Sequence, residues 1–147
     1  MKRTGFATAE CPVARALDAI GDWWSLLIVR DAFDGLRRFG DFQKNLGIAK
    51  GMLSTRLQKL VELDVLELVP ASDGSAYREY ALTRRGRDLF PVIVGLRQWG
   101  EAHRYRPQER RSVLVDTESG APVSRLELRA ADGRRIAWPD TEVIAPS

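Results

Sequence analysis

The chain has 147 residues, of which 44% are hydrophobic and 29% are charged, so we expect one soluble domain with room for a small appendage. Its formal net charge of +3 permits nucleic-acid binding without demonstrating it. No apolar run reaches the roughly 18 residues of a membrane span, and no secretory signal is recognisable, so a cytoplasmic location is expected. The single cysteine, Cys11, excludes an internal disulfide framework and a thiolate-based zinc site.

Two helices are expected near the N-terminus. The first covers residues 12–20, because Pro12 suits the first helical position, where its missing N–H would have no partner. Gly21 and Asp22 end this helix and start the next, which is predicted over residues 23–33. Apolar residues recur at helical spacing in the second helix, which indicates that it lies in the core.

A helix-turn-helix is predicted in the middle of the chain. A short helix over residues 40–46 precedes a break at Gly47 and a longer helix over residues 49–64. At about 100° per residue, one side of the longer helix is an apolar stripe that contains Leu53 and Leu57 together with Leu60 and Val61. The stripe is expected to anchor the helix to the core.

The opposite side of the longer helix is mostly small or amide-bearing. Such side chains let a helix backbone enter a major groove and can hydrogen-bond to base edges. The residues predicted to contact bases are Lys50, Gly51, Ser54, Thr55 and Gln58. Lys59 is predicted to contact phosphates. For this helix taken alone, an ordinary solvated face remains the alternative.

A β-hairpin that is typical of a "wing" follows the longer helix. A strand over residues 65–69, a polar turn over residues 70–76 and a return strand over residues 77–82 are expected, because residues 72–75 form a turn cluster. The basic residues predicted to lie along the phosphate backbone are Arg78, Arg84 and Arg85. The alternative for each is a solvated arginine.

A long helix is expected over residues 83–102, with Thr83 as its N-cap and a bend at Pro91. Its apolar side is broader than a small winged domain needs, which favours packing against a second copy of the chain. A two-fold dimer would suit a palindromic site in double-stranded DNA. The alternative is that the helix covers the rest of its own core.

The character of the sequence changes after residue 102. A basic linker precedes three alternating segments over residues 112–115, 121–129 and 135–138, which are separated by turn residues. The sequence therefore predicts a winged-helix and dimerisation domain over residues 1–102, and a linker with a small β-rich extension over residues 103–147.

Residues 10–102 resemble the HxlR family of bacterial winged helix-turn-helix transcription regulators. The motifs that carry the resemblance are the Cys11-Pro12 pair, the helix around Trp24, the Arg38-Phe39 pair and the Tyr-x-Leu-Thr-x-x-Gly run at residues 80–86. The resemblance implies a mainly α fold with a small β wing, and a homodimer joined through the first and last helices. It also implies that residues 49–63 form the recognition helix.

Some members of that family carry a C-terminal extension with paired cysteines, which suggests a bound metal. The tail of this chain has a similar turn pattern at residues 118–120 and 131–133 but no cysteine there. No metal and no cofactor are therefore expected.

The best-known signal input of the family is a thiol near the N-terminus, and Cys11 stands at that position. A cysteine at a helix N-terminus is favoured as the thiolate, which quinones or aldehydes alkylate and oxidants convert to a sulfenic acid. Either event beside a dimer helix would change the spacing of the two recognition helices. The alternative is that Cys11 is a small buried hydrophobic residue at the interface.

The predicted function is sequence-specific DNA binding by a dimeric transcription regulator, a repressor that responds to oxidants or electrophiles through Cys11. An enzyme is not expected, because no phosphate loop, nucleophile motif or metal-spaced cluster is present. One alternative is a regulator with a ligand pocket lined by Trp23, Phe33, Phe90 or Trp99, although such aromatics also serve as plain core. Another is a protein-binding winged helix, which should expose large apolar residues on the outer face of the longer helix.

Overall fold

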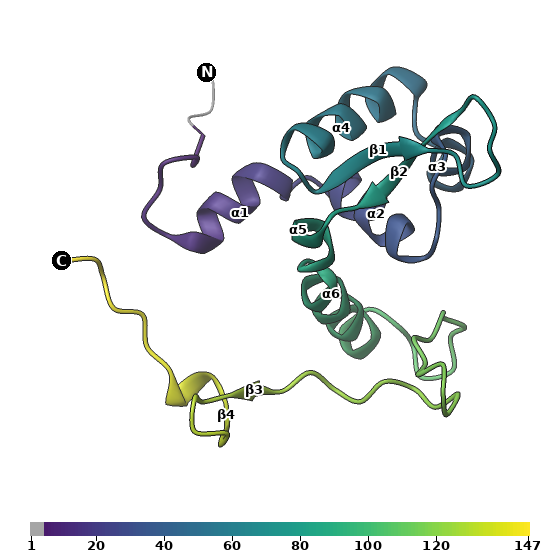
Figure 1. Cartoon of the computed structure of the whole chain (residues 1–147). Helices are drawn as coiled ribbons and strands as arrows, with labels where there is room; N and C mark the ends of the chain where they lie inside the picture. Colours follow the sequence, from purple (N-terminus) through teal and green to yellow (C-terminus); the bar gives the residue numbers. More distant parts are fainter. Residues whose placement is uncertain (1–4) are drawn as a thin grey trace. The chain divides into compact units, whose positions relative to one another are not determined.

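The structure is a computed structural model of the chain and describes residues 5–147. Figure 1 shows its elements in chain order. The first part contains α1 (Pro12–Ile20), α2 (Trp23–Phe33), α3 (Phe39–Leu46), α4 (Lys50–Glu62), β1 (Leu66–Pro70), β2 (Arg78–Leu82) and α5 (Arg84–Arg87). There follow α6 (Phe90–His103), β3 (Leu128–Arg129), β4 (Arg135–Ile136) and the 3-10 helix η1 (Trp138–Asp140).

The chain forms two compact units, Met1–Phe90 and Pro91–Ser147. The first unit holds a helix-turn-helix followed by an antiparallel hairpin, so the predicted class, mainly α with a small β wing, is confirmed. The second unit holds most of α6 and the tail with its own two-stranded sheet. The division of the sequence at residue 102 stays a prediction.

The core of the first unit is made by one face each of α2, α3 and α4 and by the start of β1. Its fully buried apolar side chains include Ile28, Val29, Phe42, Leu53, Leu57, Leu60 and Leu66. Burying one such side chain contributes about 1.5–3 kcal/mol, so the three leucines of α4 determine which face of that helix turns inward. The predicted stripe is confirmed for them, while Val61 is half-buried.

The turn between α3 and α4 depends on Gly47. Its φ of 64° lies in the left-handed region, which glycine adopts without the steric cost of a Cβ atom. Ile48, the next residue, is buried and anchors the turn to the core. The turn therefore fixes the direction in which α4 leaves α3.

The hairpin is attached to α3 as well as to itself. In the β1–β2 ladder, Leu66 lies opposite Leu82 and Leu68 lies opposite Tyr80. The Tyr80 backbone N–H also donates to the Arg37 carbonyl at 2.7 Å, and its ring meets Phe42 edge-on with centroids 6.3 Å apart. Both strands were predicted in place, each beginning one residue later in the structure than in the prediction.

The long helix predicted over residues 83–102 is wrong in one respect, because it is two helices rather than one bent helix. Thr83 is the predicted N-cap, and its hydroxyl accepts the Gly86 N–H at 3.0 Å. However, α5 ends at Arg87 and α6 begins at Phe90. Pro91 has no N–H to donate and its ring would collide with the Arg87 carbonyl, so an unbroken helix is disfavoured here. The chain instead begins a new helix with Pro91 in its first turn, where proline is tolerated.

In the second unit, the tail is tied to α6 by side-chain bonds to its backbone. The Gln98 amide donates to the Ser124 carbonyl at 3.0 Å and accepts the Leu126 N–H at 2.8 Å, as a neighbouring strand would. Arg97 donates to the Ser112 hydroxyl at 2.9 Å. The tail strands are much shorter than predicted, since residues 112–129 contribute only an isolated Val115–Pro122 bridge and β3.

Carboxylates close the two turns at which the tail lacks cysteine. Asp116 accepts the Ser119 hydroxyl at 2.8 Å, and this bond is the main reason that the pKa of Asp116 is lowered. Asp132 accepts the backbone N–H and the guanidinium of Arg134, which lower its pKa in the same way. Hydrogen bonds within the chain thus hold both turns.

Gly86 lies where α5 approaches the backbone before β1, and it generates a stability prediction. A Cβ atom at Gly86 would lie 2.1 Å from the Val65 carbonyl oxygen, which is already hydrogen-bonded to the Thr83 N–H. We expect Gly86→Ala to lower the free energy of unfolding by about 1–3 kcal/mol, measured as a lower urea midpoint. In Gly100→Ala, a control in α6 with nothing within 4 Å of the new Cβ, the free energy should stay unchanged or rise by up to about 1 kcal/mol. Equal losses in both variants would contradict the close-approach argument.

Candidate nucleic-acid interface

The outer face of α4 is open to solvent in this chain. The residues predicted to contact bases, namely Lys50, Gly51, Ser54, Thr55 and Gln58, are all exposed. The Thr55 hydroxyl donates to the Gly51 carbonyl at 3.0 Å, and the Gln58 amide donates to Glu62 at 3.3 Å. Both bonds lie at the surface, where exchanging one partner for another costs little, so base edges can replace them.

The same face carries little apolar surface. Met52, at its edge, is the large hydrophobic residue of α4 that is exposed. A helix that binds another protein through a groove presents a row of such residues at helical spacing. The composition of this face is therefore closer to that of a groove-reading helix than to that of a protein-binding one.

Two basic residues of α4 are engaged by Asp22 at the junction of α1 and α2. The Arg56 guanidinium donates to Asp22 at 3.0 Å, and the Lys59 ammonium lies 4.0 Å from the other carboxylate oxygen. Asp22 is also the N-cap of α2 and accepts the backbone N–H and hydroxyl of the buried Ser25. Burial alone would raise the pKa of Asp22, but the bonds from Ser25 and Arg56 bring it below its usual value. Sequence reasoning missed this contact, and it leaves Lys59 beside a carboxylate.

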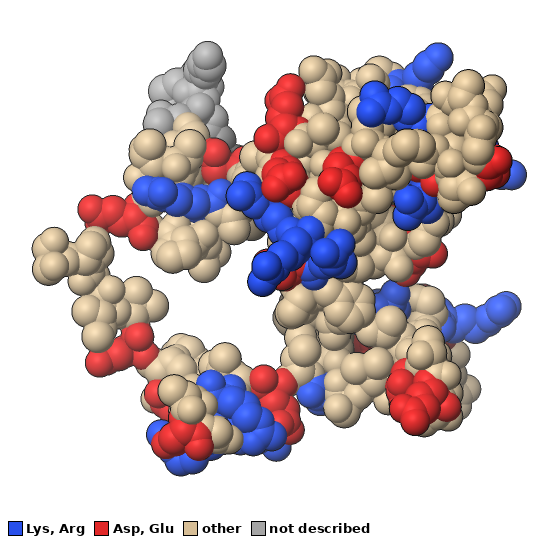
Figure 2. Space-filling model, viewed as in Figure 1, with Lys and Arg blue, Asp and Glu red and all other residues tan. Residues whose placement is uncertain are grey.

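The basic residues predicted to contact the phosphate backbone differ in their surroundings. Arg78 is exposed at the start of β2, and Arg84 is exposed on α5. Arg85 donates to the Leu63 carbonyl at 3.2 Å, so it also caps the C-terminal end of α4. Figure 2 shows a cluster of basic side chains over α5, with acidic side chains interspersed over the rest of that face.

A buried carboxylate joins the wing to the start of α3. Glu79 on β2 is only 3% exposed and accepts the Arg37 guanidinium at 2.9 Å and that of Arg38 at 3.4 Å. It also accepts the backbone N–H and the hydroxyl of Ser72, at 3.2 and 3.3 Å. The bond from Arg37 is the main reason that the pKa of Glu79 is lowered. No periodicity could reveal this cluster, because its members are up to 42 residues apart.

Arg38 is held by a second carboxylate in the wing turn. It forms an ion pair with Asp73, whose pKa of about 2 is due first to the Ser75 backbone N–H and also to Arg38. The guanidinium carbon of Arg38 lies 5.7 Å from the centre of the Tyr77 ring. Arg38, Tyr77 and Arg78 line a cleft of about 280 Å³ between the wing and the start of α3, together with residues 39–41.

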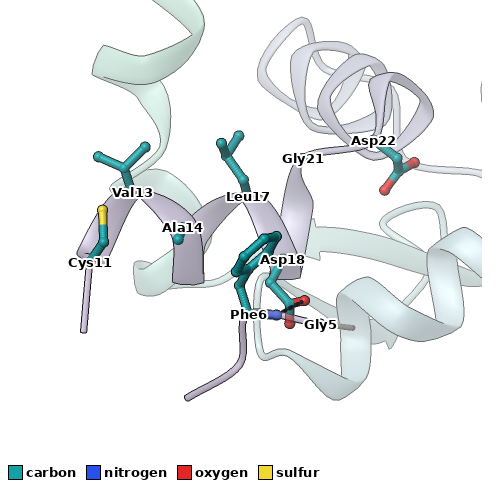
Figure 3. Close-up of a pocket in the computed structure, with 9 residues that line it drawn as sticks. All are labelled: Gly5, Phe6, Cys11, Val13, Ala14, Leu17, Asp18, Gly21 and Asp22. Atoms are coloured by element: carbon teal, nitrogen blue, oxygen red, sulfur yellow. Dashed lines mark hydrogen bonds between the residues drawn. The ribbon is translucent and has the colours of Figure 1, made fainter. Parts of the chain in front are cut away.

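Cys11 lies at the edge of a cavity beside α1. Figure 3 shows its sulfur at the start of the helix, with Val13 and Leu17 along the same helix. The cavity has a volume of about 760 Å³, and its lining also includes Phe6 and Asp22. Cys11 is exposed within the single chain, at the N-cap position of α1. A reagent in the cavity would therefore reach its thiol.

The aromatic residues considered as the lining of a ligand pocket are Trp23, Phe33, Phe90 and Trp99. Phe33 and Phe90 pack on each other, with ring centroids 5.0 Å apart. Trp23 is 72% exposed and meets Trp24 edge-on. None of the four lines the cavity beside α1.

Within residues 5–147, no helix is long and apolar enough to cross a membrane. In the same part of the chain, no group of three or more His, Cys, Asp or Glu side chains is arranged to hold a metal ion.

A helix-turn-helix anchored in a core and followed by an antiparallel hairpin defines a winged helix-turn-helix module. The profile of the HxlR-like helix-turn-helix family matches residues 19–108. The chain belongs to this family.

Relatives of known name support the assignment. The chain is 51% identical over 96 residues to MT3179, an HTH-type transcriptional regulator of Mycobacterium tuberculosis (strain CDC 1551 / Oshkosh). The match covers 65% of this chain and 61% of the relative, so the chain spans about three fifths of the length of that protein.

Solved structures are also similar. The crystal structure of PA1607, described as a transcription factor, matches with a TM-score of 0.89 and 55% identity, covering 95% of this chain and 97% of that one. The redox regulator HypR in its oxidized form matches with a TM-score of 0.58 and 31% identity, covering 65% of this chain and 100% of that one.

Asp22 has two separable roles, and its variants should distinguish them. Asparagine caps a helix about as well as aspartate but carries no charge for Arg56 and Lys59, whereas alanine loses both functions. We expect Asp22→Ala to lower the free energy of unfolding by about 1–2 kcal/mol more than Asp22→Asn does, because it also leaves the buried Ser25 hydroxyl without its acceptor. Urea denaturation of both variants measures the difference. Equal losses would mean that the ion pairs, not the cap, carry the stability.

Proposed function

We propose that this protein is a sequence-specific DNA-binding transcription regulator, a repressor that acts as a homodimer in the cytoplasm. The proposal rests on the amphipathic character of α4. Its buried leucines fix the helix to the core, while its polar and small side chains face solvent. The family match and the names of the relatives support the same function.

In this proposal, α4 enters the major groove and the wing follows the backbone. Base contacts come from Lys50, Gly51, Ser54, Thr55 and Gln58. Phosphate contacts come from Lys59, Arg78, Arg84 and Arg85. Gly51 has nothing within 4 Å of the position of a Cβ atom, so the backbone of the first turn of α4 is open to close approach.

Exposed apolar surface on α1 and α6 supports dimerisation. Val13 and Leu17 are 65% and 59% exposed on one side of α1. Val92, Leu96 and Trp99 are 46%, 53% and 61% exposed and recur at helical spacing on α6. Soluble monomers seldom leave such stripes in water, and a two-fold dimer would place two recognition helices about one turn of DNA apart.

Cys11 is proposed as the regulatory thiol. It is exposed, and it lines the cavity together with Val13 and Leu17, which belong to the face proposed for dimerisation. A quinone would react there by conjugate addition: the thiolate sulfur bonds to a ring carbon, the C=C π electrons move to the carbonyl oxygen, and protonation from water gives the hydroquinone thioether. That the similar HypR is named a redox regulator supports this role. The packing of Phe33 on Phe90 makes the aromatic ligand pocket the weaker candidate.

Selection of bound duplexes from a random pool tests DNA binding, symmetry and spacing together. We expect enrichment of an inverted repeat whose half-sites are centred about 10 base pairs apart or a multiple of that distance. A pool that shows no enrichment would contradict sequence-specific binding. A single, asymmetric half-site would contradict the homodimer.

Gln58 and Arg78 should differ in what they contribute. Gln58→Ala should relax the preference at one base position and cost roughly 1–3 kcal/mol on the selected site alone. Arg78→Ala should weaken binding to selected and random DNA alike and reduce the salt slope by about one. Titrations of both duplexes at several salt concentrations make the comparison. If both variants affected the two duplexes in the same way, the assignment of these residues would be wrong.

Cys11→Ser should keep operator binding and lose the response to electrophiles, because the hydroxyl is not ionised at neutral pH and does not add to quinones. The measurement is operator affinity before and after treatment with a quinone or hypochlorite. Because the sequence has one cysteine, the treated variant has no thiol and reports any effect of reaction at other residues. A variant that still responds would remove Cys11 as the sensor.

A further inference from the structure

We propose that Glu79 is the positioning residue of the wing, which it holds against the start of α3 so that Arg78 faces the DNA backbone. This inference rests on the proposed DNA-binding function. It concerns a residue that does not itself touch DNA, because Glu79 is buried and acidic.

The two oxygens of Glu79 each bridge the same two segments. One oxygen accepts from Arg37 and from the Ser72 backbone, and the other accepts from Arg38 and from the Ser72 hydroxyl. A buried carboxylate is unfavourable unless it is paired and hydrogen-bonded, so Glu79 favours the arrangement that supplies all four donors. That arrangement exists only when the wing turn lies on the segment before α3.

The wing turn has few other attachments to α3. Residues 72–78 are all exposed, and the β1–β2 ladder ends at the Pro70–Arg78 pair. Hydrogen bonds within the turn are local, such as that from the Ser75 N–H to Asp73. The other links of the turn to the start of α3 are the ion pair and the ring contact of Arg38, which Glu79 itself helps to orient. Beyond the turn, the Tyr80 backbone N–H also donates to the Arg37 carbonyl.

Glu79 and Arg78 are adjacent on a strand, so their side chains point to opposite faces. Arg78 instead shares its face with Tyr80, whose ring meets Phe42, and it lines the cleft at the start of α3. The place of Arg78 at this cleft therefore depends on how the wing is held against the segment before α3. Arg37 and Arg38 are neutralised by carboxylates, whereas, among the residues that the structure describes, no carboxylate lies within salt-bridge distance of Arg78. Arg78 is thus the wing cation left available for a phosphate, and its place depends on Glu79.

Combining substitutions of Glu79 and Arg78 separates two possible roles of Glu79. It either positions Arg78 or only stabilises the fold, and the two roles predict different DNA affinities for the double variant. If Glu79 acts through Arg78, the effects of the two residues on DNA affinity overlap. If Glu79 only stabilises the fold, the two effects multiply. Glu79→Gln retains the size of the side chain and removes its charge, which makes it the suitable variant.

The test measures the dissociation constants of the selected operator and a random duplex over a range of salt concentrations. The proteins are the wild type, Glu79→Gln, Arg78→Ala and the double variant. We expect each single variant to weaken both duplexes about tenfold and to reduce the salt slope by about one, with no further loss in the double variant. Arg37→Gln, which removes a partner of Glu79 without altering the hairpin, should reproduce a smaller loss of the same kind. Glu67→Gln, an exposed glutamate on β1, is the matched control and should bind as the wild type does.

Two outcomes would overturn the inference. If the wild type binds but the losses of Glu79→Gln and Arg78→Ala multiply, or Glu79→Gln leaves the salt slope unchanged, Glu79 does not position Arg78. If the wild type binds no duplex at all, the proposed function fails and this inference fails with it. Amide hydrogen exchange of residues 72–78 provides a readout without DNA, since it should accelerate in Glu79→Gln while exchange in α4 stays slow.

Discussion

The burial of three leucines on one side of α4 is the constraint on which the rest of the structure depends. Leu53, Leu57 and Leu60 are fully buried, and α2 and β1 supply the surfaces that cover them. A helix whose outer face is small and polar has little else to hold it, because hydroxyl and amide groups gain as much from water as from the protein. The apolar side therefore sets the rotation of α4, and that rotation decides which side chains face outward.

Two carboxylates connect this helix-turn-helix to the elements on either side of it. Asp22 links the α1–α2 junction to α4, and Glu79 links the wing to the segment before α3. Each accepts from an arginine and from both donors of a serine, and hydrogen bonds bring the pKa of each below its usual value. A carboxyl group with a lowered pKa contributes its stabilisation above its usual pKa and loses it as the pH falls through the lowered one, so both links are in place at neutral pH.

The local parts of this fold could be predicted from sequence, whereas the contacts between distant segments could not. Pro12, the Gly21-Asp22 break and the Thr83 cap act within a few residues, and the bounds of α1 and α2 follow from them. The sequence marked Pro91 as an interruption of the long helix. It did not show whether the helix would bend there or end and begin again. The Arg37–Glu79 pair joins residues 42 apart, and the tail strands were overestimated because alternation alone does not supply a pairing partner. That individual residues of α4 and of the wing contact DNA stays a prediction.

The second unit shows how α6, which carries more apolar surface than a winged domain needs for its core, is used in this chain. One alternative was that α6 only completes the core of its own chain. Within the second unit, Arg97 and Gln98 of α6 hold the tail, and Val94 is buried beside tail residues. The stripe of Val92, Leu96 and Trp99 stays exposed although the tail is bound to the same helix. The chain uses polar bonds to place its tail and leaves the apolar stripe uncovered by it, which supports the proposed packing against a second copy of the protein.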